Sequence, residues 1–311
     1  MIKARALVPG GTLGFVGASG ALSDSEALTC AIAKAEAMGY RVALGASCTA
    51  RYGYLSGDDA LRARDLNQMF LDDAVDAVVC IRGGYGAPRI LDLLDYEAAA
   101  RHPKPLIGYS DITALHLAYQ RMSGLITFHA PMPTGDWIEA GFEAFSAPSM
   151  FDCLSGAQVN VPLRNPEGIE PCCLRPGEAE GRLIGGNLTL MCALMGTRYM
   201  PDLRGAILLL EDVDERLYRV DRMLTQLRLA GAFDACAGLV LGQFTRCESE
   251  YADRALSFEE IVRDVVLPSG KPTLSNLMIG HVPDKLTVAF GARYHMDAAR
   301  GALTLLEAPC G

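Results

Sequence analysis

Short apolar runs alternate with helix-like segments over the first 122 residues, and this alternation limits the possible folds most strongly. We expect strands at residues 13–16, 40–44, 77–81 and 106–107, and helices at residues 23–38, 58–70, 87–94 and 112–122. Residues 23–26 read Ser-Asp-Ser-Glu, which resembles a capping box, and Gly39 is a typical residue just past a helix end. Strands that alternate with helices predict a mostly parallel sheet with helices on both faces.

The second half of the chain is organised differently. Residues 131–180 are rich in Pro, Gly and polar residues, with one expected helix at 139–151. Beyond them we expect strands at residues 204–210, 239–241, 286–289 and 303–305, and helices at residues 217–229 and 257–266. We therefore predict an α/β protein with an N-terminal domain (1–150) built on a mostly parallel sheet, a connection (151–180) and a smaller C-terminal α/β domain (181–311).

Charge and hydropathy exclude several classes of function. The 311 residues include 28 Lys and Arg and 37 Asp and Glu, which gives a net charge of −9, and there is no basic run. Such a chain is a poor candidate for binding nucleic acid or an anionic membrane. Only three apolar residues separate Arg5 from Pro9, so we expect no signal peptide, and no run is long enough to span a membrane.

The cysteine pattern points to a reducing, cytoplasmic location. None of the ten cysteines forms Cys-x-x-Cys, and several, such as Cys80, lie in apolar runs. We expect free thiols rather than disulfides, and a loop position without redox function for the adjacent pair Cys172 and Cys173. No His-Glu-x-x-His or similar cluster occurs, so we expect neither a metal nor an organic cofactor.

One strand end carries the clearest candidate for chemistry. The apolar segment at 106–107 is followed by Gly108 and then Ser110, and a helix is expected directly afterwards. A tight strand-to-helix turn exposes a serine hydroxyl at a helix N-terminus, where the helix dipole favours developing negative charge. Ile112 stands where the second glycine of Gly-x-Ser-x-Gly would be, and a simple helix cap is the alternative role for Ser110.

Two further strand ends carry candidate residues. Residues 82–86 read Arg-Gly-Gly-Tyr-Gly, and their glycines allow backbone N–H groups to turn toward a ligand. We take the N–H groups of Gly84 and Asp111 as the two donors that an oxyanion hole requires, a plain strand-to-helix turn being the alternative. Glu211 ends the strand at 204–210, where it can orient a histidine or belong to a helix-capping cluster.

A general base must come from one of five histidines, which are His102, His116, His129, His281 and His295. His281 follows Gly280 in a loop after an apolar segment, which is a suitable place for a base. His129 ends a strand at 126–128 and is its rival, whereas His116 lies inside the helix after Ser110 and is expected to pack. The residues alone leave His281 and His129 both open.

Taken together, these motifs resemble the LD-carboxypeptidase family of serine peptidases. The resemblance rests on segments that occur in the same order over nearly the whole chain, namely 51–57 (Arg-Tyr-Gly-Tyr-Leu-Ser-Gly), 82–86, 108–111 (Gly-Tyr-Ser-Asp), 185–188 (Gly-Gly-Asn-Leu), 210–213 (Leu-Glu-Asp-Val) and 280–281 (Gly-His). Each motif alone is weak, whereas the ordered set is specific.

The resemblance implies a function and assigns roles. By motif position it implies a triad of Ser110, Glu211 and His281, with the acid and base supplied by the C-terminal domain. It also implies a homodimer that removes the terminal D-Ala from the cytoplasmic murein tetrapeptide, by cleaving the bond between an L-configured centre and a D-amino acid. A cation should face the substrate carboxylate, and Arg82 is the candidate. The weaker candidates for substrate contacts are Tyr85 and Asn187.

Three alternatives stay open. One branch of the same family hydrolyses peptidyl or aminoacyl nucleotides, conferring immunity to microcin C, and stacks adenine on an aromatic loop; Trp137, the only tryptophan, is the candidate. A nucleotide-binding protein of another class is suggested by residues 14–20, but their spacing is Gly-x-x-Gly-x-x-Gly and no acid ends the next strand. A relative without catalysis is disfavoured because all three triad residue types are present.

Overall fold

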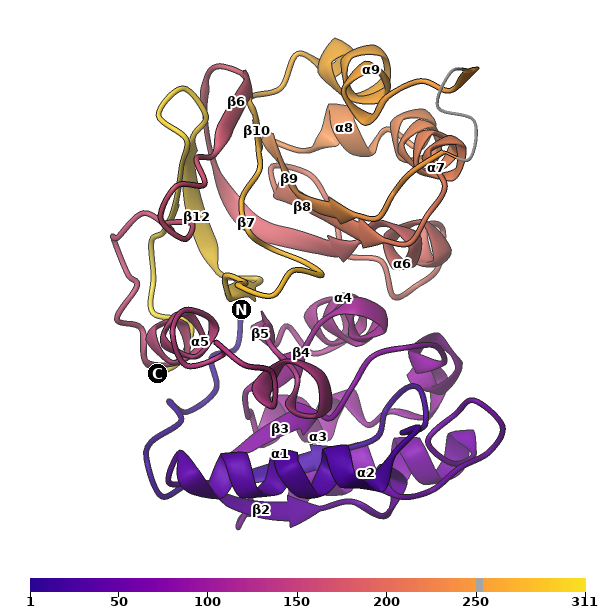
Figure 1. Cartoon of the computed structure of the whole chain (residues 1–311), viewed down its shortest axis with the longest axis vertical. Helices are drawn as coiled ribbons and strands as arrows, with labels where there is room; N and C mark the ends of the chain where they lie inside the picture. The colour runs from indigo at the N-terminus through magenta and orange to yellow at the C-terminus, as the bar shows by residue number, and fades with distance from the viewer. Residues whose placement is uncertain (250–253) are drawn as a thin grey trace.

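The computed structural model describes residues 1–249 and 254–311, which form two lobes, each built on its own sheet (Figure 1). The first sheet has six strands, which in spatial order are β11 (Val288–Phe290), β5 (Thr127–His129), β4 (Leu106–Gly108), β3 (Ala77–Cys80), β1 (Thr12–Val16) and β2 (Arg41–Leu44). Neighbours among β1 to β5 run parallel, whereas β11 pairs antiparallel with β5. Its helices are α1 (Ser25–Ala37), α2 (Asp59–Leu71), α3 (Tyr96–Arg101) and α4 (Thr113–Met122).

Strands β1 and β3 are buried along their whole length, as expected for parallel strands covered by helices on both faces. The expected helix starts are close to the observed ones, and Asp58 caps α2 by accepting from the Leu61 N–H. The capping box expected at residues 23–26 is wrong in detail. Asp24 is the N-cap residue of α1 and accepts from the Glu26 N–H, so the helix begins one residue later than a capping box starting at Ser23 would place it.

The second sheet has seven strands, which in spatial order are β13 (Ala302–Leu305), β12 (Arg293–Asp297), β7 (Glu178–Asn187), β8 (Ile207–Val213), β9 (Gly238–Thr245), β10 (Thr273–Ser275) and β6 (Cys172–Arg175). The central strands β7 to β10 run parallel, and the outer ones run antiparallel. The accompanying helices are α6 (Leu188–Leu194), α7 (Leu217–Leu229), α8 (Ala232–Ala235) and α9 (Phe258–Ile261). These two sheets confirm the predicted α/β class, with a parallel-rich first sheet.

The connection contains more structure than the sequence pattern suggested. The helix expected at 139–151 is shifted to α5 (Ser146–Ser155), because the preceding stretch begins with a π-helical turn at Pro133–Trp137. Strand β7, ten residues long, was not expected, since Gly185 and Gly186 interrupt its apolar pattern. The structural reason for Gly186 is contact with the first lobe, where a Cβ would lie 2.6 Å from Thr113 Oγ1.

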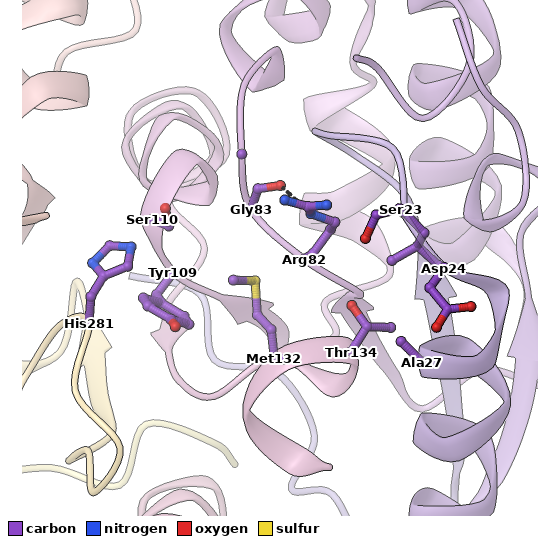
Figure 2. Close-up of a pocket in the computed structure, with 13 residues that line it drawn as sticks. Ser23, Asp24, Ala27, Arg82, Gly83, Tyr109, Ser110, Met132, Thr134 and His281 are labelled. Atoms are coloured by element: carbon purple, nitrogen blue, oxygen red, sulfur yellow. Dashed lines mark hydrogen bonds between the residues drawn. The ribbon is translucent and has the colours of Figure 1, made fainter. Parts of the chain in front are cut away.

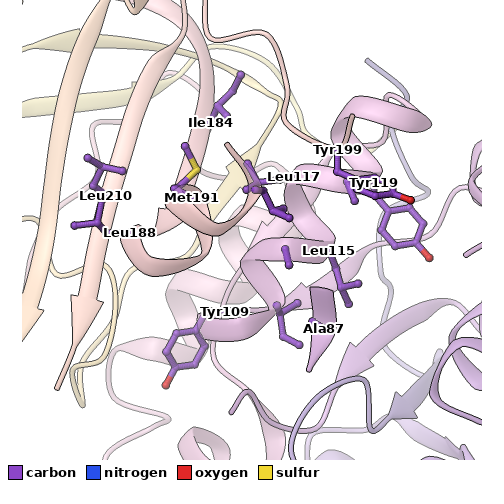
Figure 3. Packing of buried hydrophobic residues seen from close by; sticks show 14 of the residues in the cluster. Ala87, Tyr109, Leu115, Leu117, Tyr119, Ile184, Leu188, Met191, Tyr199 and Leu210 are labelled. Atoms are coloured by element: carbon purple, nitrogen blue, oxygen red, sulfur yellow. The ribbon is translucent and has the colours of Figure 1, made fainter. Parts of the chain in front are cut away.

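The two lobes share one hydrophobic core cluster (Figure 3). Leu115 and Leu117 of α4 pack in the same cluster as Ile184 of β7 and Met191 of α6. The Asn187 N–H also donates to Thr113 Oγ1 at 3.0 Å, so the second sheet is fixed directly onto the helix that follows Ser110. Because β11 then returns from the second lobe to pair with β5, the segment between β10 and β11 crosses from one sheet to the other.

Two further features bear on the sequence-based expectations. All ten cysteines are free, with Cys30, Cys172 and Cys173 exposed and Cys247 half-buried. Within residues 1–249 and 254–311, no helix has the length and apolar character needed to cross a membrane.

Candidate active site

A pocket of about 360 Å³ opens where the crossing segment meets the carboxyl end of the first sheet. Figure 2 shows Ser110 and His281 at one end of it, Ser23 and Asp24 at the other, and Arg82 between them. The pocket therefore gathers residues from the turn after β4, from the glycine-rich loop after β3, from the segment after β5, from the start of α1 and from the crossing segment.

Ser110 occupies a strained turn between β4 and α4. Its φ is +66°, a left-handed conformation that side chains other than glycine rarely adopt and that recurs at functional sites. A 3-10 helix at Ser110–Ile112 follows directly, and the serine side chain makes no capping hydrogen bond. Its Oγ has no hydrogen-bond partner among the described residues, so the strained turn exposes the hydroxyl to the pocket.

The loop after β3 packs closely on this serine. A Cβ at Gly83 would lie 2.9 Å from Ser110 Cβ and 3.0 Å from its Oγ, so only glycine allows the approach. Gly84 has a φ of +119°, and its N–H has no hydrogen-bond partner among the described residues. The Asp111 N–H lies in the first turn of the 3-10 helix, where backbone donors lack intrahelical partners. Both N–H groups therefore lie in the two segments that meet at Ser110, the loop after β3 and the turn after β4.

The Asp111 side chain points away from the pocket and holds its wall together. Its Oδ2 accepts from the Ala87 N–H at 2.8 Å and from the Ser19 hydroxyl. Burial, the largest influence, raises the pKa of Asp111, while these two donors act in the opposite direction. One carboxylate therefore ties the glycine-rich loop to the loop after β1.

Glu211 and His281 form a direct pair. Glu211 Oε2 lies 2.8 Å from His281 Nδ1, with the carboxylate fully buried on β8 and the imidazole 17% exposed in the pocket. Gly280 allows the approach, since a Cβ there would lie 2.6 Å from Glu211 Oε2. Burial raises the pKa of Glu211, and the hydrogen bond from His281 opposes that effect. A buried carboxylate that accepts from Nδ1 leaves Nε2 of the imidazole as the basic nitrogen.

No hydrogen bond joins Ser110 and His281 in the part of the chain that the structure describes. Both side chains nevertheless line the same pocket (Figure 2). The Tyr109 ring lies against the imidazole, with ring centroids 4.9 Å apart. The acid–base half of the predicted triad is therefore assembled, and the serine faces the same space.

Of the three residues predicted to contact the substrate, one lines the pocket and two do not. Arg82 lines the pocket, and its guanidinium donates to the backbone oxygens of Ala21 (2.8 Å) and Gly83 (3.2 Å). Tyr85 is 56% exposed, does not line the pocket and packs edge-on against Tyr54. Asn187 is buried, caps α6 and donates to Asp212 at 2.8 Å. The structure thus brings Arg82 to the pocket and leaves Tyr85 and Asn187 outside its lining.

The other candidate histidines and the tryptophan are core residues. His129 is buried between the Tyr109 and Phe290 rings, and burial lowers its pKa well below the ordinary value. His116 is buried as well and donates from Nε2 to the Gly108 oxygen at 2.8 Å. Trp137 is 1% exposed and donates from Nε1 to the Pro131 oxygen at 2.9 Å. None of the three lines the pocket.

Sequence reasoning missed Lys285 and Asp136, which are ion-paired beneath the pocket and bonded to Tyr109. The one available signal was a lysine four residues after a candidate base, in the segment His-Val-Pro-Asp-Lys at 281–285. Among the described residues, no three His, Cys, Asp or Glu side chains gather as a metal site would require.

Comparisons with known proteins identify the family of the chain. Residues 13–130 match the family model of the LD-carboxypeptidase N-terminal domain, and residues 180–296 match that of the LD-carboxypeptidase C-terminal domain. A probable murein peptide carboxypeptidase of Bacillus subtilis is 37% identical, with 96% of this chain and 92% of the relative covered. The murein tetrapeptide carboxypeptidase of Pseudomonas aeruginosa is 34% identical, covering 83% and 84%.

Among solved structures, the microcin C7 self-immunity protein in an inactive mutant apo state superimposes with a TM-score of 0.93 over the full length of both chains. The sequence identity is 24%, so this likeness concerns the fold.

Proposed function

The chain belongs to the LD-carboxypeptidase family of serine-type hydrolases, and from this premise we propose that it releases the terminal D-Ala of murein tetrapeptide with Ser110 as nucleophile. The observation that carries the proposal is the convergence of two features on one pocket. These features are the strained Ser110 and the His281 imidazole backed by buried Glu211. The names of the Bacillus and Pseudomonas relatives support the choice of a murein peptide.

The proposed reaction uses each group in turn. His281 Nε2 takes the Ser110 proton as Oγ attacks the carbonyl carbon before the terminal D-Ala. The N–H groups of Gly84 and Asp111 stabilise the resulting oxyanion, and Glu211 stabilises the imidazolium through Nδ1–H. His281 then protonates the departing amine of D-Ala, and an activated water releases the acyl group from Ser110. The water gives its hydroxyl to the acyl carbon and its proton through His281 to Ser110 Oγ, so the serine is regenerated and the sequence balances as a hydrolysis.

Arg82 is proposed to face a substrate carboxylate, because it is the arginine that lines the pocket, between Ser110 at one end and Asp24 at the other. Two of its guanidinium nitrogens already donate to backbone oxygens, which fixes the side chain in place. A pre-positioned guanidinium loses little entropy on binding an anion. We propose no direct substrate role for Tyr85 or Asn187, given their positions.

The nucleotide-peptide branch is the second candidate, favoured by the full-length structural likeness to the microcin C7 self-immunity protein. A role in this branch would require Trp137 to lie where it can stack on adenine. Trp137 instead packs in the core, with its ring 5.9 Å from that of Phe15 in edge contact. We therefore propose murein tetrapeptide as the substrate.

A substrate comparison tests the choice. Purified enzyme is given murein tetrapeptide in one reaction and an aminoacyl-sulfamoyl adenosine in another, and released D-Ala and amino acid are quantified. Turnover of tetrapeptide at least tenfold above that of the nucleotide supports the proposal. Turnover of the nucleotide alone would assign the chain to the other branch.

Three broader aspects are also proposals. The acidic composition and free thiols support a cytoplasmic location, where cell-wall peptides are recycled. A homodimer is proposed from the family resemblance. We propose a domain division near residues 151–180, consistent with the ranges matched by the two family models.

A further inference from the structure

A buried polar cluster joins three segments that surround the pocket. Lys285 Nζ donates to Tyr109 OH at 3.0 Å and to Asp136 Oδ1, and Tyr109 OH donates to the same Asp136 oxygen at 3.2 Å. Lys285 is 2% exposed, and Asp136 also accepts from the Met132 N–H at 2.7 Å. We call Lys285, Asp136 and Tyr109 the anchor cluster.

Each member of the anchor cluster adjoins a different part of the site. Lys285 ends the segment that begins at His281, and Tyr109 directly precedes Ser110. Asp136 follows Thr134 and Gly135, which form part of the pocket lining. The cluster therefore links the base, the nucleophile and the pocket wall through three side chains.

The cluster also constrains the orientation of the imidazole. The Lys285 ammonium lies 4.4 Å from the Tyr109 ring centroid, and the His281 ring centroid lies 4.9 Å from it. Since the Tyr109 hydroxyl is held at Lys285 and Asp136, the ring cannot tilt without breaking these hydrogen bonds. The ring therefore presents a fixed surface against which His281 packs.

Energetics favour one arrangement of these segments. A buried ammonium is costly unless it is paired and hydrogen-bonded, so any shift of the crossing segment that separates Lys285 from Asp136 is strongly disfavoured. The Lys285 backbone N–H donates in addition to Ser146 Oγ at 2.9 Å, fixing the segment on its other side. The hydrogen bond to Glu211 holds His281 at one nitrogen only. Without the anchor cluster, this bond by itself would restrict the rotation of the loop less.

We propose that Lys285 and Asp136 are positioning residues, which hold Tyr109 and the His281 loop so that the imidazole faces Ser110. This inference rests on the proposed function only in taking Ser110 as nucleophile and His281 as base. It requires no particular substrate, so it can be tested with a serine-directed probe.

The test measures the second-order rate of labelling by a fluorophosphonate, together with the thermal midpoint, for Lys285→Met, Asp136→Asn and the double variant. Each single variant leaves one charged partner unpaired and should lose stability. The double variant removes both charges, so its midpoint should recover toward that of the wild type. Its labelling should remain at least tenfold slower, because the anchor to the crossing segment is still missing.

Lys104→Met is the matched control. Lys104 is also a buried lysine, donates to the Met69 oxygen at 2.8 Å, and lies before β4, at the end of the strand opposite Ser110. It should lose stability and keep wild-type labelling. Wild-type labelling in the double variant would overturn the inference and leave the catalytic assignment intact. A wild-type enzyme that does not react would overturn the nucleophile assignment and this inference together.

Discussion

The Glu211 carboxylate and the His281 imidazole lie 2.8 Å apart, although 70 positions separate them in the chain. Glu211 comes from β8 of the second sheet, whereas His281 sits on the segment that crosses to the first sheet. Because an ionised carboxylate can only accept, it fixes the proton on Nδ1 and leaves Nε2 free. The pairing thus allows the imidazole to act as a base through Nε2, on the side that faces the pocket.

This relationship predicts the effect of Glu211→Gln. The side-chain amide can donate to Nδ1, which favours the wrong tautomer and removes the charge that stabilises the imidazolium. We expect kcat to fall by about 10³ to 10⁴-fold with a smaller change in KM. Steady-state kinetics of D-Ala release measure both constants. A kcat within tenfold of the wild type would show that Glu211 does not orient the base.

Gly83→Ala should disturb the nucleophile without altering any polar group. The added Cβ would lie within 3.0 Å of both Ser110 Cβ and Oγ, so the serine or the loop must move. A displacement of this size should lower kcat by about 10²-fold. Gly238→Ala is the control, since its Cβ would meet Met296 Cε at 2.6 Å in the second sheet. That control should lose stability and retain kcat; equal kcat in both variants would contradict the prediction.

The pattern of the sequence was sufficient for strands β1 to β5 of the first sheet and for the serine turn. It did not place β11 there, because the strand expected at 286–289 was assigned to the C-terminal domain, whereas β11 pairs with β5. Strands such as β3 are short apolar runs bounded by turn residues, which local reasoning identifies. Strand β7 was not predicted, because the glycine at position 186 is required by a close contact with Thr113, which lies 73 positions earlier in the chain. The choice between His281 and His129 likewise depends on burial, which only the folded chain defines.

The anchor cluster illustrates the same limit. Lys285 meets Asp136 and Tyr109 across 149 and 176 positions, and no spacing rule connects residues so far apart. A single lysine next to Asp284 in a loop is a weak signal before its partners are known. Long-range polar pairs of this kind therefore had to come from the structure.

Stability should depend on pH through His116. Burial lowers the pKa of His116 from 6.5 to about 4, so between these values the unfolded chain binds more protons at this site than the folded one. This contribution to stability is complete above pH 6.5 and is lost as pH falls toward 4. In His116→Gln, whose amide can still donate to the Gly108 oxygen, it should disappear. Urea unfolding at pH 7.5 and pH 5 measures the decrease in the free energy of unfolding between these two pH values. We expect this decrease to be about 2 kcal/mol smaller in His116→Gln than in the wild type.

An unchanged pH dependence in His116→Gln would contradict the assignment of a neutral, buried imidazole. Buried His129 is present in both proteins, and burial, rather than the smaller influence of His116, is the main cause of its low pKa.

Thiol reactivity should follow burial. Cys30, Cys172 and Cys173 are exposed and should react rapidly with a thiol reagent in the native protein. Burial raises the pKa of Cys48 and of Cys310 to about 12, so these thiols should react only after unfolding. None of the exposed three lines the active-site pocket, and D-Ala release should survive their modification. Inactivation on modification of the exposed thiols would place one of them at the catalytic machinery.

Release of D-Ala from murein tetrapeptide by the wild type and by Ser110→Ala tests the central claim most directly. The substitution removes one oxygen from a half-buried side chain that has no hydrogen-bond partner among the described residues, so folding should be preserved and circular dichroism can verify it. We predict release by the wild type and a loss of about 10⁴-fold or more in the variant. Equal release by both proteins would contradict the assignment of Ser110 as the nucleophile.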